Sequence, residues 1–481
     1  MALLAAFAVP HPPLIIPAVG KGEERGIQAT IDAYREVGRR ICNLAPQTIV
    51  VSSPHSVMYR DYLHISPGAG AKGSFASFGA PQARYQASYD QNLVAALCAA
   101  ADADGLAAGT EGERDPRLDH ATMIPLHFIQ EAYAQAGRRA DYQVVRMGLS
   151  GLGPQDHYHL GQLVQKVTDV LGRRVVFVAS GDLSHKLSED GPYGFAPEGP
   201  RFDQAVCDAF SKGDFLSLLT LDRSLADRAA ECGLRSFQIM AGALDQTPVR
   251  PELLSYEGPF GVGYGVASFT PAGPEGSDPS RAFLDLYQAW RRRDMRRRKE
   301  AEGPLVKLAR LAVERYVLYG ERTRADSPFD LALLEKPLPD GALRARAGCF
   351  VSIKEEGDLR GCIGTIAPTK ASLAQEICDN AVSACAHDPR FPAVREEELG
   401  SLVYSVDVLE APEPIGGLDL LDPARYGVIV STGDGRRGLL LPDLDGVDTA
   451  TEQVRIAARK GGIDLARDDW SLERFEVVRH T

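Results

Sequence analysis

Three histidines each follow a short apolar run that ends in small or turn-forming residues. His11 lies in Pro10-His11-Pro12-Pro13 after the run Leu3–Val9, and His55 ends Gln47-Thr-Ile-Val-Val-Ser-Ser-Pro-His55. His185 ends Gly181-Asp-Leu-Ser-His185 after the run Val175–Ser180. Such runs predict buried strands. Ligands of open α/β sheets bind beyond the carboxyl ends of the strands, so we expect the three imidazoles to converge on one site.

Two neutral imidazoles and one carboxylate form the facial triad that binds non-haem Fe(II) and leaves positions open for substrate and dioxygen. His11 and His55 are the imidazole candidates, and the prolines beside them stiffen the backbone, which would hold the ligands in place. Glu231, before Cys232 and Gly233, is the carboxylate candidate. A surface acid at a helix end is the competing interpretation of Glu231.

The elements that must position these residues alternate along the first 270 residues. The sequence predicts strands over Leu3–Val9, Thr48–Ser53, Gln143–Leu149, Val175–Ser180 and Gly261–Phe269, with helical patterns between them. This order is typical of an α/β domain with a parallel sheet. The glycine-rich stretch Gly68–Arg84 is expected to be a loop, whose first part serves either as a lid over the site or as ordered surface.

A change of composition divides the chain. Residues 271–284 are rich in Pro, Gly and Ser, which predicts a linker between a domain of residues 1–270 and one of residues 285–481. The second domain is expected to be a smaller α+β domain. Its first helix carries the run Arg291-Arg-Arg-Asp-Met-Arg-Arg-Arg-Lys299, which we interpret as a solvated helix face.

Net charge, cysteine content and the apolar N-terminus argue against several classes of protein. A net charge of −12 argues against nucleic acid as the main partner, because phosphate binding needs a concentrated positive field. The eight cysteines include no C-x-x-C pair and are expected to be reduced thiols of a cytoplasmic protein. The apolar N-terminus lacks a leading Lys or Arg and is interrupted by prolines, so neither a signal peptide nor a membrane span is predicted.

Five motifs together resemble the catalytic subunit of class III extradiol ring-cleavage dioxygenases, the LigB type, over about residues 1–270. They are Pro-His11-Pro-Pro, Ser-Pro-His55-Ser, Leu-Asp-His120-Ala-Thr-Met-Ile-Pro-Leu, Ser-Gly-Asp-Leu-Ser-His185 and Gly-Val-Gly-Tyr264-Gly-Val-Ala. The resemblance implies that His11, His55 and Glu231 bind Fe(II), that His185 is the acid/base and that His120 hydrogen-bonds substrate or oxygen. It implies a catechol or related hydroxylated aromatic and dioxygen as substrates, and we leave a homodimer open as the assembly.

The same fold resembles the Memo family, whose metal ligand at the third position is a cysteine. Cys232 therefore competes with Glu231 for that position, and a thiolate would favour copper(I) or zinc. The alternative function is a metal-binding redox or signalling protein without ring-cleavage activity. A metal-dependent hydrolase is a third reading, since an open metal site can also activate water.

The second domain has a cysteine motif of its own. Asp358-Leu-Arg-Gly-Cys362-Ile-Gly-Thr365 places a thiol between glycines, which favours a small residue in tightly packed backbone over a catalytic thiol. This motif, with His387-Asp-Pro-Arg-Phe-Pro392 and Ala458-Arg-Lys-Gly-Gly462, resembles the AMMECR-type domain over roughly residues 285–481. In the alternative interpretation the motif is catalytic, with Cys362 as the nucleophile and His387 as its base.

The remaining histidines of the first domain have weaker contexts. His127 lies seven residues after His120 and is expected to pack within the same helix. His64, His157 and His159 are expected at the surface or in loops.

Overall fold

The computed structural model describes residues 2–273, 277–334, 337–339, 341–444 and 446–481. The chain forms two compact units, residues 1–290 and residues 291–481, and the division falls within helix α10 (Phe283–Ala301). Residues 274–276, in the middle of the predicted linker, lie outside the described residues. No helix among the described parts of the chain is long and apolar enough to cross a membrane.

The first unit is built on a six-stranded sheet in the order β7-β2-β8-β1-β10-β9. The four strands β7 (Gln143–Gly148), β2 (Thr48–Ser53), β8 (Val175–Ser180) and β1 (Leu3–Val9) are parallel neighbours. Strands β10 (Tyr264–Pro271) and β9 (Val249–Glu257) continue the sheet in antiparallel register. The predicted α/β class is confirmed.

The apolar runs became strands because both faces of the sheet are buried. In β1, Ala6 and Ala8 belong to the apolar core on one face, whereas Phe7 and Val9 belong to the core on the other. This alternation follows from the two-residue period of a strand, and it explains why these runs are apolar throughout.

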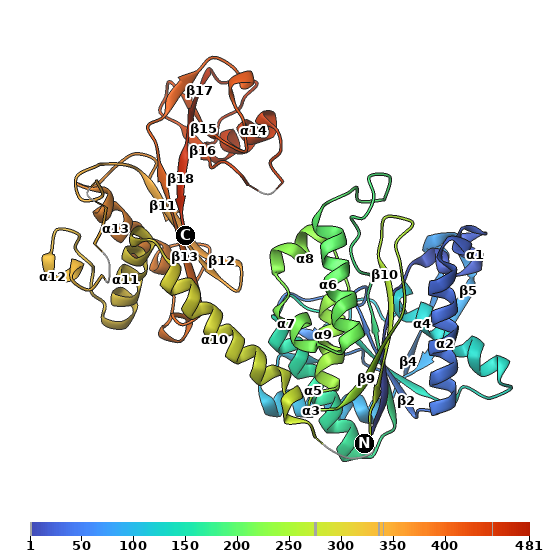
Figure 1. The fold of residues 1–481 in the computed structure, drawn as a ribbon. Coiled ribbons are helices and arrows are strands. Elements are labelled where there is room, and N and C mark those ends of the chain that lie inside the picture. Colours follow the sequence, from blue (N-terminus) through green and yellow to red (C-terminus); the bar gives the residue numbers. More distant parts are fainter. Residues whose placement is uncertain (1, 274–276, 335–336, 340, 445) are drawn as a thin grey trace. The chain divides into compact units, whose positions relative to one another are not determined.

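Helices cover both faces of this sheet (Figure 1). Helices α2 (Gln28–Leu44) and α4 (His120–Gln135) pack on one face. The other face is covered by α3 (Gln91–Asp104), α5 (Pro154–Leu171), α6 (Glu198–Lys212), α7 (Phe215–Thr220) and α9 (Leu234–Ala243). The shorter elements of the first unit are α1 (Pro17–Gly20), α8 (Arg223–Ala229), β3 (Leu63–His64), β4 (Gly70–Phe75), β5 (Ala80–Ser88) and β6 (Ala108–Gly109).

Two local expectations were wrong. The predicted loop Gly68–Arg84 is largely the antiparallel hairpin β4–β5, whose small residues allow close approach: a Cβ at Gly73 would meet the Leu118 carbonyl oxygen at 2.5 Å. His64 and His157 are buried, in β3 and α5, and not at the surface. His157 is satisfied there, because its Nδ1 contacts the Gly153 carbonyl and its Nε2 accepts from the Ser150 N–H.

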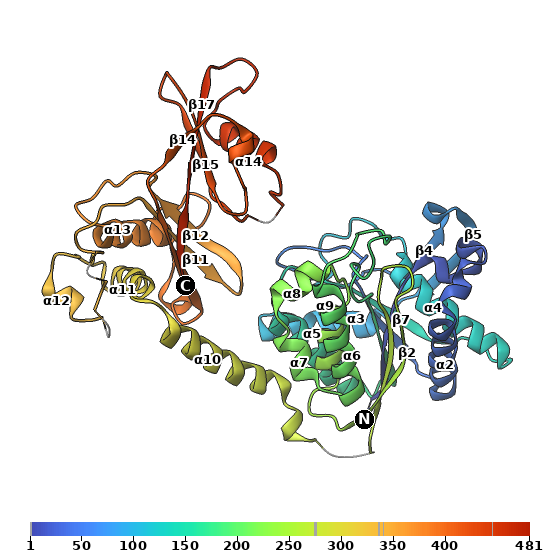
Figure 2. The same ribbon diagram turned by 45° about the horizontal axis from the view of Figure 1, so that its top comes forward.

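The second unit contains two four-stranded antiparallel sheets (Figure 2). The first, β12-β11-β13-β18, packs its apolar face on helices α11 and α13, and the second, β14-β17-β15-β16, packs on α14. The predicted α+β character is confirmed. The strands are β11 (Cys349–Glu355), β12 (Asp358–Gly364), β13 (Leu402–Leu409), β14 (Glu413–Ile415), β15 (Gly427–Thr432), β16 (Arg437–Leu440), β17 (Trp470–Phe475) and β18 (Val477–His480). The helices are α11 (Pro304–Tyr319), α12 (Pro328–Leu331), α13 (Leu373–Ala386) and α14 (Ala450–Lys460).

Candidate metal centre

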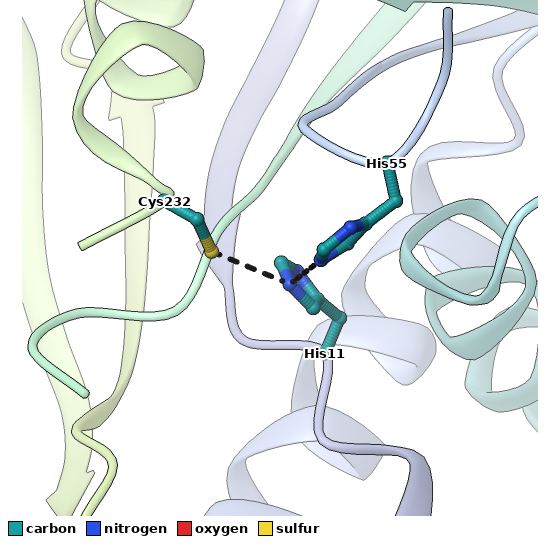
Figure 3. Close-up of side chains that lie close together, drawn as sticks. All are labelled: His11, His55 and Cys232. Atoms are coloured by element: carbon teal, nitrogen blue, oxygen red, sulfur yellow. Dashed lines mark hydrogen bonds between the residues drawn. The ribbon is translucent and has the colours of Figure 1, made fainter. Parts of the chain in front are cut away.

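His11, His55 and Cys232 come together at the carboxyl ends of the strands (Figure 3). His11 follows β1, His55 follows β2, and Cys232 lies between α8 and α9. The two Nε2 atoms of the histidines are 3.1 Å apart, and Cys232 Sγ lies 3.5 Å from His11 Nε2. The three potential ligand atoms all lie within 4.8 Å of one another.

This set of donors fits a metal ion. With metal–nitrogen bonds of about 2.0–2.1 Å and a metal–sulfur bond of about 2.3 Å, ligand atoms in a tetrahedral site lie roughly 3.3–3.6 Å apart. The distances from His11 to the other two groups are close to these values. Burial lowers the pKa of His11 and of His55, so both imidazoles are neutral at neutral pH, as metal ligands must be.

Hydrogen bonds at the ring Nδ1 and at the backbone N–H orient His11. Its Nδ1 lies 3.1 Å from the Ser180 hydroxyl at the end of β8, which leaves Nε2 directed at the other two groups. The backbone N–H of His11 donates to Asp182 at 2.6 Å. Burial raises the pKa of the Asp182 carboxyl to about 7. A second group that holds a histidine through its other nitrogen is the usual support of a metal ligand.

Glu231, the first choice for the third ligand, is placed differently from Cys232. Its carboxylate accepts the Leu234 N–H at 2.7 Å, at the start of α9, and burial raises its pKa to about 7. The chain turns just before it, because Ala230 has a φ of 53°. The structure therefore brings together His11, His55 and the alternative ligand Cys232, and it directs the Glu231 carboxylate to a helix end.

His120 and His185 lie beside this cluster. The His120 ring is 4.2 Å from that of His55 and 5.4 Å from that of His11, centroid to centroid. Burial lowers the pKa of His120 to about 4. His185 Nδ1 donates to the Ala230 carbonyl, which can only accept, so its neutral ring carries the lone pair on Nε2.

Two aromatic side chains accompany these histidines. Phe78, in the turn between β4 and β5, lies 5.2 Å from the His120 ring, and Tyr193 lies 5.2 Å from the His185 ring. They are 37% and 61% exposed, respectively. The segment that was expected to be either a lid or ordered surface thus places an exposed aromatic ring against His120.

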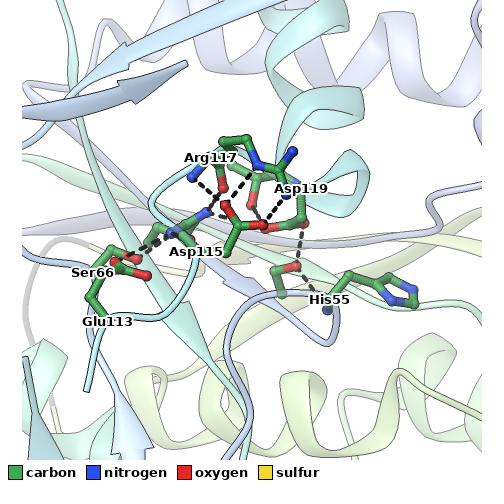
Figure 4. A network of polar contacts seen from close by, with 9 residues as sticks. His55, Ser66, Glu113, Asp115, Arg117 and Asp119 are labelled. Carbon is green, nitrogen blue, oxygen red and sulfur yellow. Dashed lines mark hydrogen bonds and ion pairs between the residues drawn. The ribbon is translucent and has the colours of Figure 1, made fainter. Parts of the chain in front are cut away.

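A polar network that sequence reasoning missed links the His55 backbone to Asp119, the residue before His120; Figure 4 shows His55 and Asp119 in this network. Asp119 caps α4 by accepting the Thr122 N–H, and it also accepts the Ser53 hydroxyl at 2.6 Å. The Ser53 hydroxyl in turn accepts the backbone N–H of His55. One carboxylate therefore connects the end of β2 to the start of the helix that carries His120.

The buried side chain of Arg146, in β7, supports this network. Its guanidinium donates to the Ser66 hydroxyl at 2.7 Å and to the Arg117 carbonyl at 2.5 Å, and it lies 3.6 Å from Asp119 and 3.7 Å from Glu113. The side chain is 1% exposed. The sequence contained a signal, since a charged residue interrupts the apolar run Val144-Val-Arg-Met147.

The other candidates lie apart from the cluster. His127 contacts the Tyr85 hydroxyl at 2.9 Å and packs against Phe128, in agreement with a helix-packing role. In the second unit, Cys362 Sγ accepts from the Ser352 hydroxyl, whereas the His387 ring lies against Tyr316. The structure thus shows different neighbours for Cys362 and His387.

Comparison with known proteins agrees with the two units. Residues 5–267 match the family model of the catalytic LigB subunit of aromatic ring-opening dioxygenase, and residues 306–480 match that of AMMECR1. The protein CA_C1420 of Clostridium acetobutylicum is 36% identical over 498 aligned residues, which cover all of this chain and 99% of the relative. A Thermotoga maritima protein is 48% identical over 180 residues, covering 37% of this chain and 98% of its own length.

Two solved structures are also similar to parts of the chain. An uncharacterized protein of Pyrococcus horikoshii, PH0010, matches with a TM-score of 0.31 and 29% identity, over 36% of this chain and 88% of its own. An uncharacterized protein of Escherichia coli K12, JW3007, matches with a TM-score of 0.34 and 15% identity, over 55% of this chain and 99% of its own. On its family match and its full-length relative, the chain belongs to the family of the catalytic LigB subunit of aromatic ring-opening dioxygenases, and it carries an AMMECR1 domain after the LigB domain.

Proposed function

We propose that the first unit is a metal-dependent enzyme of the extradiol-dioxygenase type that acts on a catechol or a related hydroxylated aromatic. The observation that carries the proposal is the convergence of His11, His55 and Cys232 with two further histidines beside them. In this proposal His11 and His55 hold the metal, and the third ligand is Cys232, which lies beside them, or Glu231, which the family resemblance implies. Fe(II) is the first choice because the chain belongs to the LigB family, whereas a thiolate by itself would favour copper(I) or zinc. The bound metal would bring the aromatic ring and dioxygen together.

His185 is the proposed acid/base. Its Nδ1–H is engaged by the Ala230 carbonyl, so Nε2 is the atom that takes a proton from a phenol and later returns it. Nε2 lies 4.0 Å from the Asp182 carboxylate, which would stabilise the protonated ring. Burial lowers the pKa of His185, so the ring is unprotonated at neutral pH and can accept a proton.

Substrate contacts come from His120 and the aromatic side chains. A neutral imidazole at His120 can either donate a hydrogen bond to a substrate oxygen or accept one from it. Phe78 and Tyr193 lie beside the two histidines and offer flat surfaces for stacking on a planar ring. These contacts favour a small aromatic substrate that carries a hydroxyl group.

The test is metal analysis of anaerobically purified protein, followed by oxygen uptake with catechol. We expect about one equivalent of iron and a yellow ring-cleavage product. His185→Ala should retain the metal and lower the turnover by about 10²–10⁴-fold, the usual contribution of a positioned acid/base. Iron-loaded protein that consumes no oxygen with a series of catechols would exclude ring cleavage.

A second candidate is favoured by the thiol in the cluster. Thiolate ligands select copper(I) and zinc more readily than carboxylates do. A copper-binding redox or signalling protein without ring cleavage would therefore use the same three side chains. It would take up one equivalent of copper(I) in competition with a chelator and would show no oxygen uptake with catechol.

A further inference from the structure

A pocket of about 480 Å³ lies at the opposite edge of the same sheet from the metal cluster. It is formed where three connections enter parallel strands, just before Thr48 of β2, Gln143 of β7 and Val175 of β8. These strands have six residues each, so the two edges are separated by about 20 Å at roughly 3.3 Å per residue. The pocket is therefore distinct from the proposed metal centre.

Four arginines line this pocket: Arg138, Arg139, Arg173 and Arg174. Asp141 is the acidic residue of the lining, so the lining has an excess of three positive charges. The whole chain has a net charge of −12. A concave surface with a concentrated charge opposite in sign to that of the protein attracts small ions of the other charge.

Helix-end capping explains only part of this arrangement. Arg138 donates to the Cys42 carbonyl and Arg174 to the Ala45 carbonyl, both at the C-terminal end of α2. A guanidinium has five N–H donors, so such a contact fixes the group and leaves other donors for a ligand. Capping does not account for Arg139 and Arg173, which line the same pocket.

These other two arginines have carboxylate partners. Arg173 lies 3.1 Å from the buried Asp90, which holds its guanidinium. Arg139 pairs with Asp141 at 2.8 Å, and the two side chains are 88% and 69% exposed. Ion pairs at such exposure contribute little, so an incoming anion can replace Asp141 at low cost.

Two tyrosines complete the wall. The rings of Tyr133 and Tyr142 lie 5.7 Å apart, and the Arg138 guanidinium lies 5.8 Å from the Tyr133 ring centroid. A guanidinium stacked on an aromatic ring is held in one plane, which suits two-point recognition of phosphate or carboxylate. The volume is within the usual range of pockets for small molecules.

We infer that this pocket is a second ligand site, which binds a small polyanion carrying two or more phosphate or carboxylate groups. The proposal is independent of the metal centre and of the reaction proposed there. The ligand would bridge guanidinium groups from the connection after α4 and the connection after α5.

The test is calorimetric titration of the full-length protein with inorganic pyrophosphate, and separately with citrate, at fixed ionic strength. We expect saturable binding of one of the two probes, and the probe that binds assigns the ligand to phosphate or carboxylate chemistry. The double variant Arg138→Gln/Arg174→Gln should weaken binding by at least about tenfold, since hydrogen bonds to charged groups are the stronger class.

The matched control is Arg35→Gln/Arg39→Gln, which removes the same charge from exposed positions on α2 outside the pocket lining. This variant should bind like the unmodified protein. Because Arg138 and Arg174 also hold backbone carbonyls, the exposed Arg139→Gln provides a variant that should fold normally, which thermal unfolding would verify, and should bind about three- to fivefold more weakly. Absence of saturable binding for both probes, or equal binding by the pocket variants and the control, would overturn the proposal.

Discussion

The surroundings of two cysteines, one in each unit, differ in what they offer to a metal ion. Cys232 lies among neutral imidazoles, and its Sγ and the two Nε2 atoms are directed at one another. Cys362 lies in β12, where its Sγ accepts from Ser352 and its backbone N–H donates to Asp388. The first group offers three lone-pair donors to one point, whereas the second consists of matched donors and acceptors.

Packing and charge explain why the surroundings of Cys362 differ from those of Cys232. At Gly361, beside Cys362, a Cβ would meet the Ala384 carbonyl oxygen at 2.2 Å, so the glycine allows α13 to approach the strand closely. Asp388 is paired with Arg390 at 2.7 Å. Hydrogen-bonded ion pairs and close backbone contacts stabilise a fold without a ligand. Around Cys232 the three side chains contact one another only through His11 Nε2, at 3.1 Å and 3.5 Å, and a bound cation would add further stability.

The largest expected effect tests this difference directly. Cys232→Ala should lower the metal affinity by more than about 100-fold, because a lost ligand costs more than the 10–100-fold of an outer hydrogen-bond partner. Cys362→Ala should leave the metal content unchanged. Both are measured by metal analysis after anaerobic purification and dialysis. If Glu231→Ala removes the metal and Cys232→Ala does not, the third ligand is the carboxylate.

Removal of the buried Arg146 guanidinium should have the next largest effect, on the free energy of unfolding of the first unit. Arg146→Met leaves Asp119 and Glu113 without their cation, and breaking a buried ion pair costs about 3–5 kcal/mol of the free energy of unfolding. Urea unfolding followed by Trp290 fluorescence, in a Trp470→Phe background, would report the first unit. Arg39→Met, at a position 61% exposed in the first unit, is the control and should cost less than about 1 kcal/mol. An equal effect of the two substitutions would contradict a supporting role of Arg146.

The ion pair near Cys362 should make the second unit sensitive to acid. The Arg390 guanidinium holds the pKa of the Asp388 carboxyl well below its usual range. A carboxyl with a lowered folded-state pKa adds stability above its unfolded pKa of about 3.9, and this stability is lost as the pH falls toward the folded value.

Asp388→Asn should therefore cost about 1.5–3 kcal/mol at pH 7, as expected for a hydrogen bond to a charged group, and should flatten the dependence of stability between pH 5 and pH 2. The measurement is urea unfolding followed by Trp470 fluorescence in a Trp290→Phe background. A variant that loses stability with acid as steeply as the parent would show that other carboxyls dominate.

The smallest expected effects on the free energy of unfolding come from removing the hydroxyl of Ser53 or of Ser352. Ser53→Ala removes the link between Asp119 and the His55 backbone and should cost about 0.5–1.5 kcal/mol, the usual net value of a hydrogen bond. Ser352→Ala removes a hydrogen bond to sulfur, which is a weak acceptor, and should cost less. Urea unfolding of both variants decides the order, and a larger cost for Ser352→Ala would mean that the second thiol is the more tightly constrained.

Much of the fold could be predicted because local pattern and burial agree. The runs at Leu3–Val9, Thr48–Ser53 and Val175–Ser180 are apolar throughout, and each became a parallel strand buried on both faces. The predictions failed where tertiary contacts override the pattern. Glycines between residues 68 and 84 suggested a loop, but they form a hairpin because small residues permit close approach to neighbouring backbone.

The sequence by itself determined that His11 and His55 would meet, since parallel strands place their carboxyl ends at one edge of the sheet. It also determined the two family resemblances. Only the tertiary structure decided between Glu231 and Cys232 as neighbours of those histidines. Adjacent residues in a turn project in different directions, and the backbone angle at Ala230 and the start of α9 set which side chain enters the cluster. The contacts of Arg146 and the lining of the arginine pocket come from chain segments that are distant in sequence. Only the folded structure therefore shows that these residues lie together.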